Sequence, residues 1–585
     1  MKDFLTKHTN IFLSLLGGIA IWVFWAFIHP EALSYHEQFQ MFLFDTDYLL
    51  ARLALPGGMA DYIAEFVVQF FFIISLGAVF LTLLFLLLQQ ITWRLARKWG
   101  ATDMYYPLSF IPVVYMMGTM CNPDVMISLI VALTAVLAIA LLHATIKSPK
   151  LRLASIILIL PLSFWLFGYV TAALPVLFAF NEWRSKQPTK SIATTFGVSL
   201  AVSILIIAAL YLFAGLIHRG INAILIGFNF FRFDDQTPST QHICVAVITL
   251  FPALLSFIPA IRKAEKWGAI SLTALVLVVG AFHLTKQFDK SMWRMIKYDY
   301  LVRTLHWDSI ISMAEKTPSP TPYDAACVNL ALGMKGQLGE RMFEFPQFGT
   351  EGLIMPFSSN HFATLAQSEI FYQLAMVNEA QRFFFEAQAA IPNHYESTRV
   401  YRRLAETNLI NSHYGVAQRY LLRLKRTLFY RSWAESRLKM IENKELFNKE
   451  NEYYNLRKLS GKTDILYSTN LLNQTLARLY YQNKSNSLAH EYALAYAVLD
   501  KNIKFFNEIL NHDAAHWKKY VMPRHWQEAY LLATIAKEDR DLPVTNEAME
   551  DFRSFFNAYS NNPNDPMLSI GRLKTSAWSY ILGTK

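Results

Sequence analysis

The sequence predicts an all-α protein: a polytopic α-helical membrane domain of about nine spans over residues 1–285, followed by a helical-repeat α-solenoid over residues 286–585. Three observations predict this fold. Charged residues make up only 17% of the 585-residue chain, against roughly a quarter in soluble proteins. The shortage lies in the first half, which has 17 Lys and Arg with 13 Asp and Glu, whereas the second half has 37 and 31. Long apolar runs fill the first half, and amphipathic helical periodicity fills the second.

The same composition excludes several classes of protein. A single soluble domain, a disordered chain and a collagen do not combine these two halves. The chain has three cysteines, which is too few for a disulfide framework, and none has metal-ligand spacing. The net charge of +10 is spread over both halves without a run of five basic residues, so we expect no nucleic-acid partner.

Nine apolar segments are long enough, or nearly so, to cross a bilayer as helices. We read the first as a retained span because it exceeds the apolar core of a signal peptide and has no small-residue cleavage site. Two adjacent segments are short and are interrupted near Pro161 and Gly168, which predicts either tilted helices or a re-entrant pair. The predicted spans are 11–28, 66–90, 105–120, 125–143, 151–168, 169–180, 192–218, 242–261 and 268–285.

The distribution of lysine and arginine predicts the orientation of these spans. Four short loops carry three basic residues each, and they alternate with loops that carry only Arg52, Arg219 and Arg232. Basic loops remain in the cytoplasm. The pattern therefore predicts a multi-pass protein of a bacterial inner membrane, with a cytoplasmic N-terminus and a periplasmic C-terminal domain.

One segment of the second half has the spacing of a known repeat. It resembles the second half of a tetratricopeptide repeat, in which small residues let paired helices pack closely. The alternative is an irregular helical domain. The spacing is carried by Phe371, Ala380, Phe384, Ala387 and Pro392, with a second register at Ala417, Leu421 and Leu424.

The loop after the first span is rich in acids and histidines, which include His36, Glu37 and Asp45. Acidic side chains beside hydrocarbon are costly unless they have a partner or a function. The apolar spacing over 39–53 predicts an amphipathic helix lying along the membrane surface. We expect 56–58, Pro-Gly-Gly, to end that helix before the return span.

This arrangement resembles the polytopic glycosyltransferases of the GT-C architecture, which combine an acidic first outer loop, a juxtamembrane helix and many spans. The resemblance implies that Glu37 and Asp124 are catalytic acids, and that His36, Arg219 and Arg232 contact the substrate. The chain also resembles multi-pass proteins of Bacteroidota with tetratricopeptide-like tails. The match is architectural: His36 stands where a second loop acid is expected, and the outer domain has no Trp-Trp-Asp-type motif.

The chemistry implied by the resemblance starts from a sugar on a polyprenyl phosphate in the membrane. A carboxylate such as Glu37 acts as general base on an acceptor hydroxyl. The leaving diphosphate needs either an arginine or a divalent cation, Mg or Mn, for which Asp124 is the candidate ligand. The expected partners are membrane lipids, this donor, and a protein or glycan acceptor bound by the repeat domain.

Structural interpretations stand beside these roles. Glu37 and Asp45 are also explained as solvated loop carboxylates, Asp124 as the cap of the helix that follows it, and Arg232 as the partner of 234–235, Asp-Asp. On that view the membrane half is an anchor, and the repeat domain is a scaffold for an envelope complex without catalytic activity.

Overall fold

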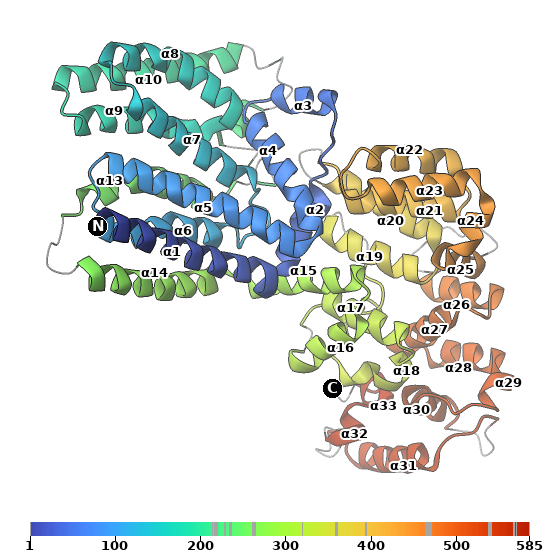
Figure 1. Ribbon diagram of the computed structural model, residues 1–585. Helices are drawn as coiled ribbons and strands as arrows, with labels where there is room; N and C mark the ends of the chain where they lie inside the picture. Colours follow the sequence, from blue (N-terminus) through green and yellow to red (C-terminus); the bar gives the residue numbers. More distant parts are fainter. Residues whose placement is uncertain are drawn as a thin grey trace. The chain divides into compact units, whose positions relative to one another are not determined.

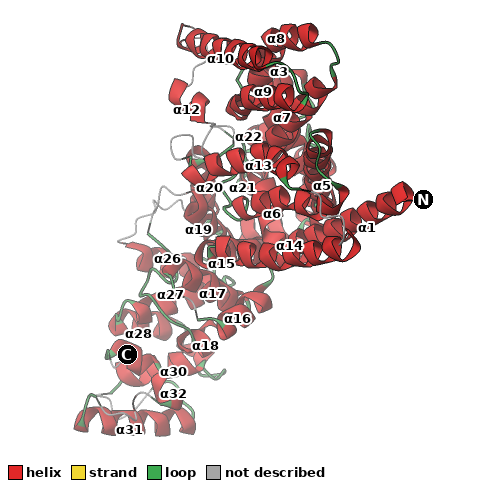
Figure 2. Cartoon of the chain, turned by 90° about the vertical axis from the view of Figure 1, so that its left-hand side faces the viewer, coloured by secondary structure: helices red, strands yellow, loops and turns green. Residues whose placement is uncertain are grey.

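The computed structural model is helical throughout the residues that it describes (Figure 2). The chain divides into two compact units. Unit 1 contains Met1–Trp293 together with two inserted segments from the second half, Ile391–Arg399 and Arg423–Trp433, and unit 2 contains the remainder. The described residues are 2–212, 215, 220–226, 230–232, 237–259, 265–318, 320–356, 361–391, 395–461, 471–535, 541–564, 568 and 570–583.

Unit 1 is a bundle of long apolar helices with a group of short helices at one end (Figure 1). Its elements are α1 Lys2–Val23, η1 Phe24–Ile28, α2 Pro30–Phe39, α3 Thr46–Leu53, α4 Gly58–Val68, η2 Gln69–Phe72, α5 Ile74–Lys98, η3 Asp103–Phe110, α6 Ile111–Thr119, α7 Ser128–Thr145, α8 Pro149–Phe167, η4 Gly168–Ala173, α9 Leu174–Arg184, α10 Thr189–Leu212, α12 Ile221–Ile226, α13 Ser239–Phe257 and α14 Glu265–Gln287. The short helices α2, α3 and α4 occupy the predicted outer loop.

Seven helical stretches of the described residues are long and apolar enough to cross a membrane. The sequence predicted nine spans, and two differences account for the lower number. The stretch Pro149–Arg184 contains two predicted spans, α8 and α9. The predicted third span contains α6, which has only 9 residues and follows a 3-10 helix. The second span is also displaced: α5 begins at Ile74, because α4 and η2 occupy the residues before it.

The long helices run between two ends of unit 1. We call one the α2 end, and it contains the described residues of 29–73, 120–127, 167–170, 230–242 and 287–293. We call the other the basic end, and it contains the described residues of 94–105, 145–152, 182–190 and 257–268.

Contacts between distant residues define the α2 end. The indole of Trp293 donates a hydrogen bond to the carbonyl of Cys121 (2.6 Å), and the amide of Gly57 donates to the carbonyl of Trp165 (2.9 Å). The ring of Tyr169 packs edge-on against His242, with 5.4 Å between the ring centroids. The loops after η1, α6, α8 and α14 therefore meet at this end.

Other contacts define the basic end. Arg152, at the start of α8, lies 2.8 Å from Glu182, at the end of α9. Since these residues begin one helix and end the next, α8 and α9 run antiparallel and meet at Gly168, where φ is +68°. The hydroxyl of Tyr105 donates to the carbonyl of Pro259 (2.7 Å), which joins the start of η3 to the end of α13.

Unit 2 consists of helices that follow one another in antiparallel pairs, such as α19 against α20 (Figure 1). It begins within α15 Lys290–Arg303. Its other elements are α16 Trp307–Lys316, α17 Pro322–Met334, α18 Leu338–Arg341, η5 Met342–Glu344, α19 His361–Gln373, α20 Val377–Ala390, α21 Thr398–Ile410, α22 Tyr414–Leu424, α23 Arg431–Glu442, α24 Lys444–Lys449, α25 Asn451–Leu459, α26 Leu472–Gln482, α27 Ser487–Leu499, α28 Ile503–His512, α29 Ala514–Trp517, α30 Arg524–Ala533, α31 Asn546–Asn561, α32 Gly571–Lys574 and α33 Ala577–Ile581.

The positions that predicted a repeat lie in the core of these pairs. Phe371, Ala380, Phe384 and Ala387 are all fully buried, as the packing of one helix on its neighbour requires. The helical pairing is therefore observed. Its assignment as a tetratricopeptide-like solenoid stays a prediction.

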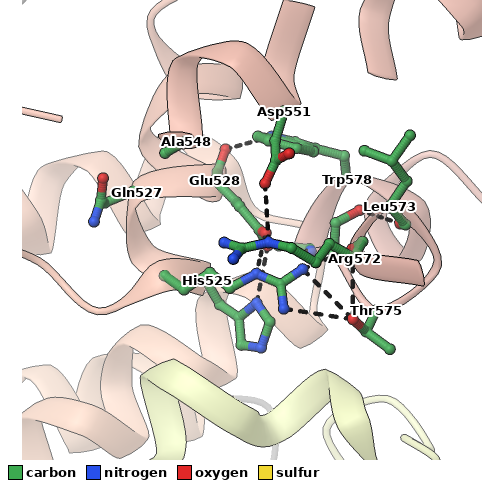
Figure 3. A network of polar contacts seen from close by, with 12 residues as sticks. His525, Gln527, Glu528, Ala548, Asp551, Arg572, Leu573, Thr575 and Trp578 are labelled. Atoms are coloured by element: carbon green, nitrogen blue, oxygen red, sulfur yellow. Dashed lines mark hydrogen bonds and ion pairs between the residues drawn. The ribbon is translucent and has the colours of Figure 1, made fainter. Parts of the chain in front are cut away.

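The C-terminal helices of unit 2 are joined by a network of polar contacts around Glu528 (Figure 3). Its carboxylate accepts hydrogen bonds from His525 (2.9 Å) and from the amide of Ala577 (2.7 Å), and its carbonyl accepts one from the indole of Trp578 (2.6 Å). Arg572 lies 3.1 Å from Asp551. These contacts fix α33 against α30 and α32 against α31.

Candidate functional site

Glu37 lies on α2, whose residues are almost all buried. Pro30 opens the helix at a position where proline costs no hydrogen bond. The Glu37 carboxylate accepts hydrogen bonds from the hydroxyls of Tyr430 (2.9 Å) and Thr398 (3.2 Å), both from the inserted segments of unit 1. With 4% of its surface exposed, Glu37 is an enclosed, hydrogen-bonded carboxylate and not the solvated loop acid of the structural interpretation.

The amphipathic helix predicted over 39–53 is wrong for its first half, and its second half is the helix α3. α2 ends at Phe39, residues 40–45 are not helical, and α3 begins at Thr46 after Asp45 caps it. The amides of Met41 and Phe44 donate hydrogen bonds to the carbonyls of Glu396 and Arg426. Because the inserted segments supply backbone partners on one side and bury 41–43, an extended conformation replaces the helix that local periodicity predicted.

A second group of acids lies on α4. The carboxylate of Glu65 receives two hydrogen bonds from Arg52, at 2.7 and 3.0 Å, and one from the hydroxyl of Tyr48. One turn earlier, both oxygens of Asp61 lie within 2.8 Å of the hydroxyl of Tyr395. Both carboxylates are buried. We call Glu37, Asp61 and Glu65, with their partners, the carboxylate cluster.

Glycine makes the approach of these helices possible. A Cβ added at Gly58, the first residue of α4, would lie 1.8 Å from the carbonyl oxygen of Arg52. Gly57 before it has φ of +84°, a left-handed conformation that glycine adopts without strain. The predicted Pro-Gly-Gly break is therefore observed, and it brings Arg52 on α3 beside Glu65 on α4.

Burial sets the titration of two groups in this region. It raises the pKa of the Glu65 carboxyl to about 7, with Asp61 adding to the rise and Arg52 opposing it. Burial and, to a smaller extent, the nearby positive charge of Arg232 together lower the pKa of the His36 imidazole to about 3. His36 is therefore neutral at physiological pH.

Asp124 lies in the loop between α6 and α7, where its amide is held by the side chain of Asn122 (3.0 Å). Its carboxylate lies 3.5 Å from the Arg232 guanidinium, and its carbonyl accepts a hydrogen bond from the Arg232 amide (2.7 Å). Burial raises the pKa of the Asp124 carboxyl, while Arg232 and a hydrogen bond from Tyr35 oppose the rise. The helix-cap alternative is wrong, because α7 begins at Ser128 with Ile127 in the capping position.

Arg232 is completely buried, so it does not reach a phosphate directly. Its guanidinium lies over the rings of Tyr35 and Phe39, at 5.1 and 4.9 Å from their centroids. These contacts and the ion pair fix Asp124 in place. The structure therefore makes Arg232 a partner of Asp124.

Asp124 lines an open pocket of about 430 Å³ at the α2 end, which we call the Asp124 pocket. Its side chains are mostly polar and neutral, which suits a ligand with many hydroxyl groups. The lining residues are Tyr115, Gly118, Thr119, Cys121, Asn122, Pro123, Asp124, Thr240, His283, Gln287, Asp289 and Met292.

An apolar groove of about 210 Å³ lies along the same pair of helices, α6 and α14, and is closed by α1. On α6, Tyr115 and Gly118 line the pocket whereas Val113, Val114 and Met117 line the groove. The groove is lined almost entirely by apolar residues of α1, η1, η3, α6 and α14, so it offers an apolar surface beside a polar pocket.

The structure brings some of the predicted site residues together and separates others. Asp124 and Arg232 form an ion pair, and the positive charge of Arg232 lowers the pKa of His36. Glu37 is on the face of α2 opposite to Tyr35 and Phe39, because residues two apart on a helix point in nearly opposite directions. It does not line the Asp124 pocket. Arg219 lies outside the described residues.

Sequence reasoning missed the hydrogen-bond partners of the carboxylate cluster and the residues that α14 contributes to the Asp124 pocket. Asp61 and Glu65 stand one helical turn apart beside Arg52, a signal that was present in the loop. Tyr395 and Tyr430 gave no signal, because they lie hundreds of residues away. His283 and Gln287 line the pocket from the end of a predicted span, where polar side chains are easily read as interfacial.

A metal site is not formed by the part of the chain that the structure describes, since no three His, Cys, Asp or Glu side chains there are grouped to hold an ion. The predicted ligand Asp124 already has a cationic partner in Arg232. A Mg or Mn ion with Asp124 as its ligand stays a prediction, and no step below depends on one.

Comparison with curated proteins and with solved structures finds no match. One family model, described as a family of unknown function (DUF6057), matches residues 6–584. The match spans nearly the whole chain and therefore covers both units. The protein belongs to the DUF6057 family.

Proposed function

We propose that the protein is an integral membrane glycosyltransferase that takes its sugar from a polyprenyl phosphate at the α2 end. One observation carries the proposal: the Asp124 pocket and the apolar groove share the helices α6 and α14. A lipid-linked sugar has the same two parts, an apolar chain and a polar headgroup. The groove suits the polyprenyl chain, and the polar, mostly neutral pocket suits the hydroxyl groups of the sugar.

The proposed chemistry uses Asp124 as general base. Its carboxylate takes the proton from the acceptor hydroxyl as the hydroxyl oxygen bonds to the anomeric carbon. The bond from that carbon to the phosphate oxygen breaks, and the polyprenyl phosphate or diphosphate leaves with the electron pair. Arg232 positions the carboxylate, and the raised pKa of Asp124 suits a group that takes up a proton.

Charge distribution supports the proposed topology. In the described parts of unit 1 the basic end carries Arg94, Arg97, Lys98, Lys147, Lys150, Arg152, Arg184, Lys186 and Lys190. Basic residues remain on the cytoplasmic side of a membrane. We infer that the basic end is cytoplasmic, that the α2 end faces the periplasm of a bacterial inner membrane, and that unit 2 follows on that side. A tetratricopeptide-like unit 2 there would position a protein or glycan acceptor.

A noncatalytic scaffold for an envelope complex is the second candidate, and a different observation favours it. The loop acids that suggested chemistry are largely engaged: Glu37, Asp61 and Glu65 are buried in hydrogen bonds, two of them to the inserted segments. On this view the carboxylate cluster only fastens parts of the chain together.

The experiment compares Asp124→Asn with Asp47→Asn in cells that lack the native gene. Asp47 is an exposed acid at the same end of unit 1 and lies outside the pocket. At equal protein levels we expect Asp124→Asn to lower the surface-glycan product by about 10²–10⁴-fold, the usual contribution of a general base. Asp47→Asn should behave as wild type.

Reconstituted protein provides the second readout, which is consumption of a lipid-linked sugar extract. If Asp124→Asn retains wild-type glycans and consumption while removal of residues 434–585 abolishes the phenotype, the transferase proposal fails and the scaffold is supported.

A further inference from the structure

A second large pocket opens at the basic end of unit 1, and neither its residues nor its position belongs to the proposed transfer site. It has a volume of about 660 Å³ and lies between α1, α5 and η3. We call it the basic-end pocket. It is lined by Asn10, Ile11, Ser14, Leu15, Leu86, Gln90, Trp93, Arg94, Arg97, Asp103 and Tyr106.

The lining changes in character along α5. Arg94 and Arg97, one helical turn apart, lie nearest the end of the helix. One turn further into the bundle, the amide of Gln90 donates hydrogen bonds to Tyr106 (2.7 Å) and to Ser14 (3.1 Å). A cationic rim therefore leads to a neutral polar layer.

Apolar residues lie beside and below this polar layer, since Ile11 and Leu15 flank Ser14 and Leu86 is one turn deeper than Gln90. Leu86 on α5 and Ile11 and Leu15 on α1 line the same pocket. Ile11 and Leu15 are among the exposed large apolar side chains of unit 1, so they offer hydrocarbon contact at this side of the bundle. Cations, hydrogen-bonding groups and hydrocarbon in one pocket are the parts of a binding site for an amphiphile with a negative headgroup.

The charge of the rim is not balanced by its neighbours. Asp103 lies 3.6 Å from Arg97 and offsets one positive charge. Arg94 makes no hydrogen bond or ion pair with any residue that the structure describes, and its side chain is exposed. The rim thus keeps a net positive charge and at least one guanidinium with all its donors available.

We propose that the basic-end pocket binds a phosphate group, with Arg94 and Arg97 as its ligands. A guanidinium binds phosphate oxygens through two parallel hydrogen bonds. The same chemistry fits the headgroup of an anionic phospholipid and a soluble phosphate compound. The apolar inner wall adds contact only for the lipid. The pocket is thus a site at the opposite end of the bundle from the Asp124 pocket.

The test measures binding of phosphatidylglycerol and phosphatidylcholine to the purified full-length protein by native mass spectrometry. The variant is Arg94→Gln with Arg97→Gln. The matched control is Lys147→Gln with Lys150→Gln, which removes the same charge from exposed positions at the same end but outside the pocket. Both arginines are exposed, so we expect unchanged thermal unfolding for both variants.

Wild type and the lysine control should bind phosphatidylglycerol at least about tenfold more tightly than the arginine variant, a difference of about 1.4 kcal/mol. Phosphatidylcholine should show no such difference. Equal binding of phosphatidylglycerol by the arginine variant and the lysine control overturns the proposal. In a further arm, displacement of the lipid by inorganic phosphate assigns the site to the anion alone, and resistance to displacement assigns it to the lipid.

Discussion

The acids at the α2 end differ in how far their carboxylates are buried and in what surrounds them. In the carboxylate cluster, Glu37 and Glu65 are enclosed and each has at least two hydrogen bonds from side chains. Asp124 keeps 17% of its side chain exposed and lines a pocket. Acids that look alike beside a membrane span can thus be structural or available to a ligand. Position in the loop does not distinguish them, but the neighbours do.

The largest effect should follow Arg52→Ala, which tests whether the carboxylate cluster is structural. The change leaves Glu65, with no exposed surface, without its bidentate cation. Removing one partner of a buried ion pair costs about 3–5 kcal/mol. We expect a loss of that size in the free energy of unfolding, measured by chemical denaturation in detergent micelles. A loss below about 1 kcal/mol would show that Glu65 is neutral without its partner.

A pH titration sharpens the same comparison through His36. Its pKa of about 3 in the folded protein lies below the ordinary value of 6.5, so the unfolded chain binds more protons between these values. The free energy of unfolding therefore rises with pH over that window. His36→Gln should remove about 3 kcal/mol of the rise between pH 4 and pH 6.5.

Glu65 gives the opposite trend and serves as the control for that titration. Its raised pKa of about 7 means that the folded protein binds more protons between pH 4.5 and pH 7, so stability from this group is lost as pH rises. Between pH 4.5 and pH 6.5, His36→Gln should make the free energy of unfolding rise less steeply with pH. Glu65→Gln should make it rise more steeply. Parallel profiles for the two variants would contradict both assignments.

Tyr395→Phe should have a smaller effect. The change removes the hydroxyl that contacts both oxygens of Asp61, and hydrogen bonds to charged groups contribute about 1.5–3 kcal/mol. Tyr454→Phe, at a side chain with 45% exposure, is the matched control and should leave the denaturation midpoint unchanged. Equal denaturation midpoints for the two variants would show that the Tyr395 hydroxyl does not stabilise the carboxylate cluster.

Arg426→Ala should have the smallest effect. Arg426 forms an ion pair with Asp45 at 2.6 Å, but 56% of the arginine side chain is exposed. Exposed pairs contribute about 0–1 kcal/mol. The denaturation midpoint should barely move, and the small shift should vanish in high salt. A salt-independent loss would place this pair among the buried contacts.

The sequence predicted much of the fold because its signals are local. Long apolar runs and clusters of lysine and arginine are properties of neighbouring residues. The helical passages and the composition of the basic end could therefore be read directly. The pairing of Asp124 with Arg232 was not predicted, because the two residues are more than 100 positions apart and the sequence offered 234–235, Asp-Asp, as a nearer partner for the arginine.

The candidate site could be predicted only in part. Glu37 was chosen by its distance from the first span, but its hydrogen-bond partners lie 361 and 393 residues further along the chain. The first half of the helix predicted over 39–53 failed for the same reason, since backbone partners at Glu396 and Arg426 stabilise an extended segment there. Local periodicity carries no information about such partners.

By itself, the sequence determined an all-α chain whose first half contains apolar helices long enough to cross a membrane, because apolar runs and helical periodicity are properties of neighbouring residues. Only the tertiary structure decided which acids are engaged. It enclosed Glu37 with residues from the second half of the chain and left Asp124 at the rim of a pocket. The cost of burying a charge depends on the groups around it, and those groups are assembled from distant parts of the chain.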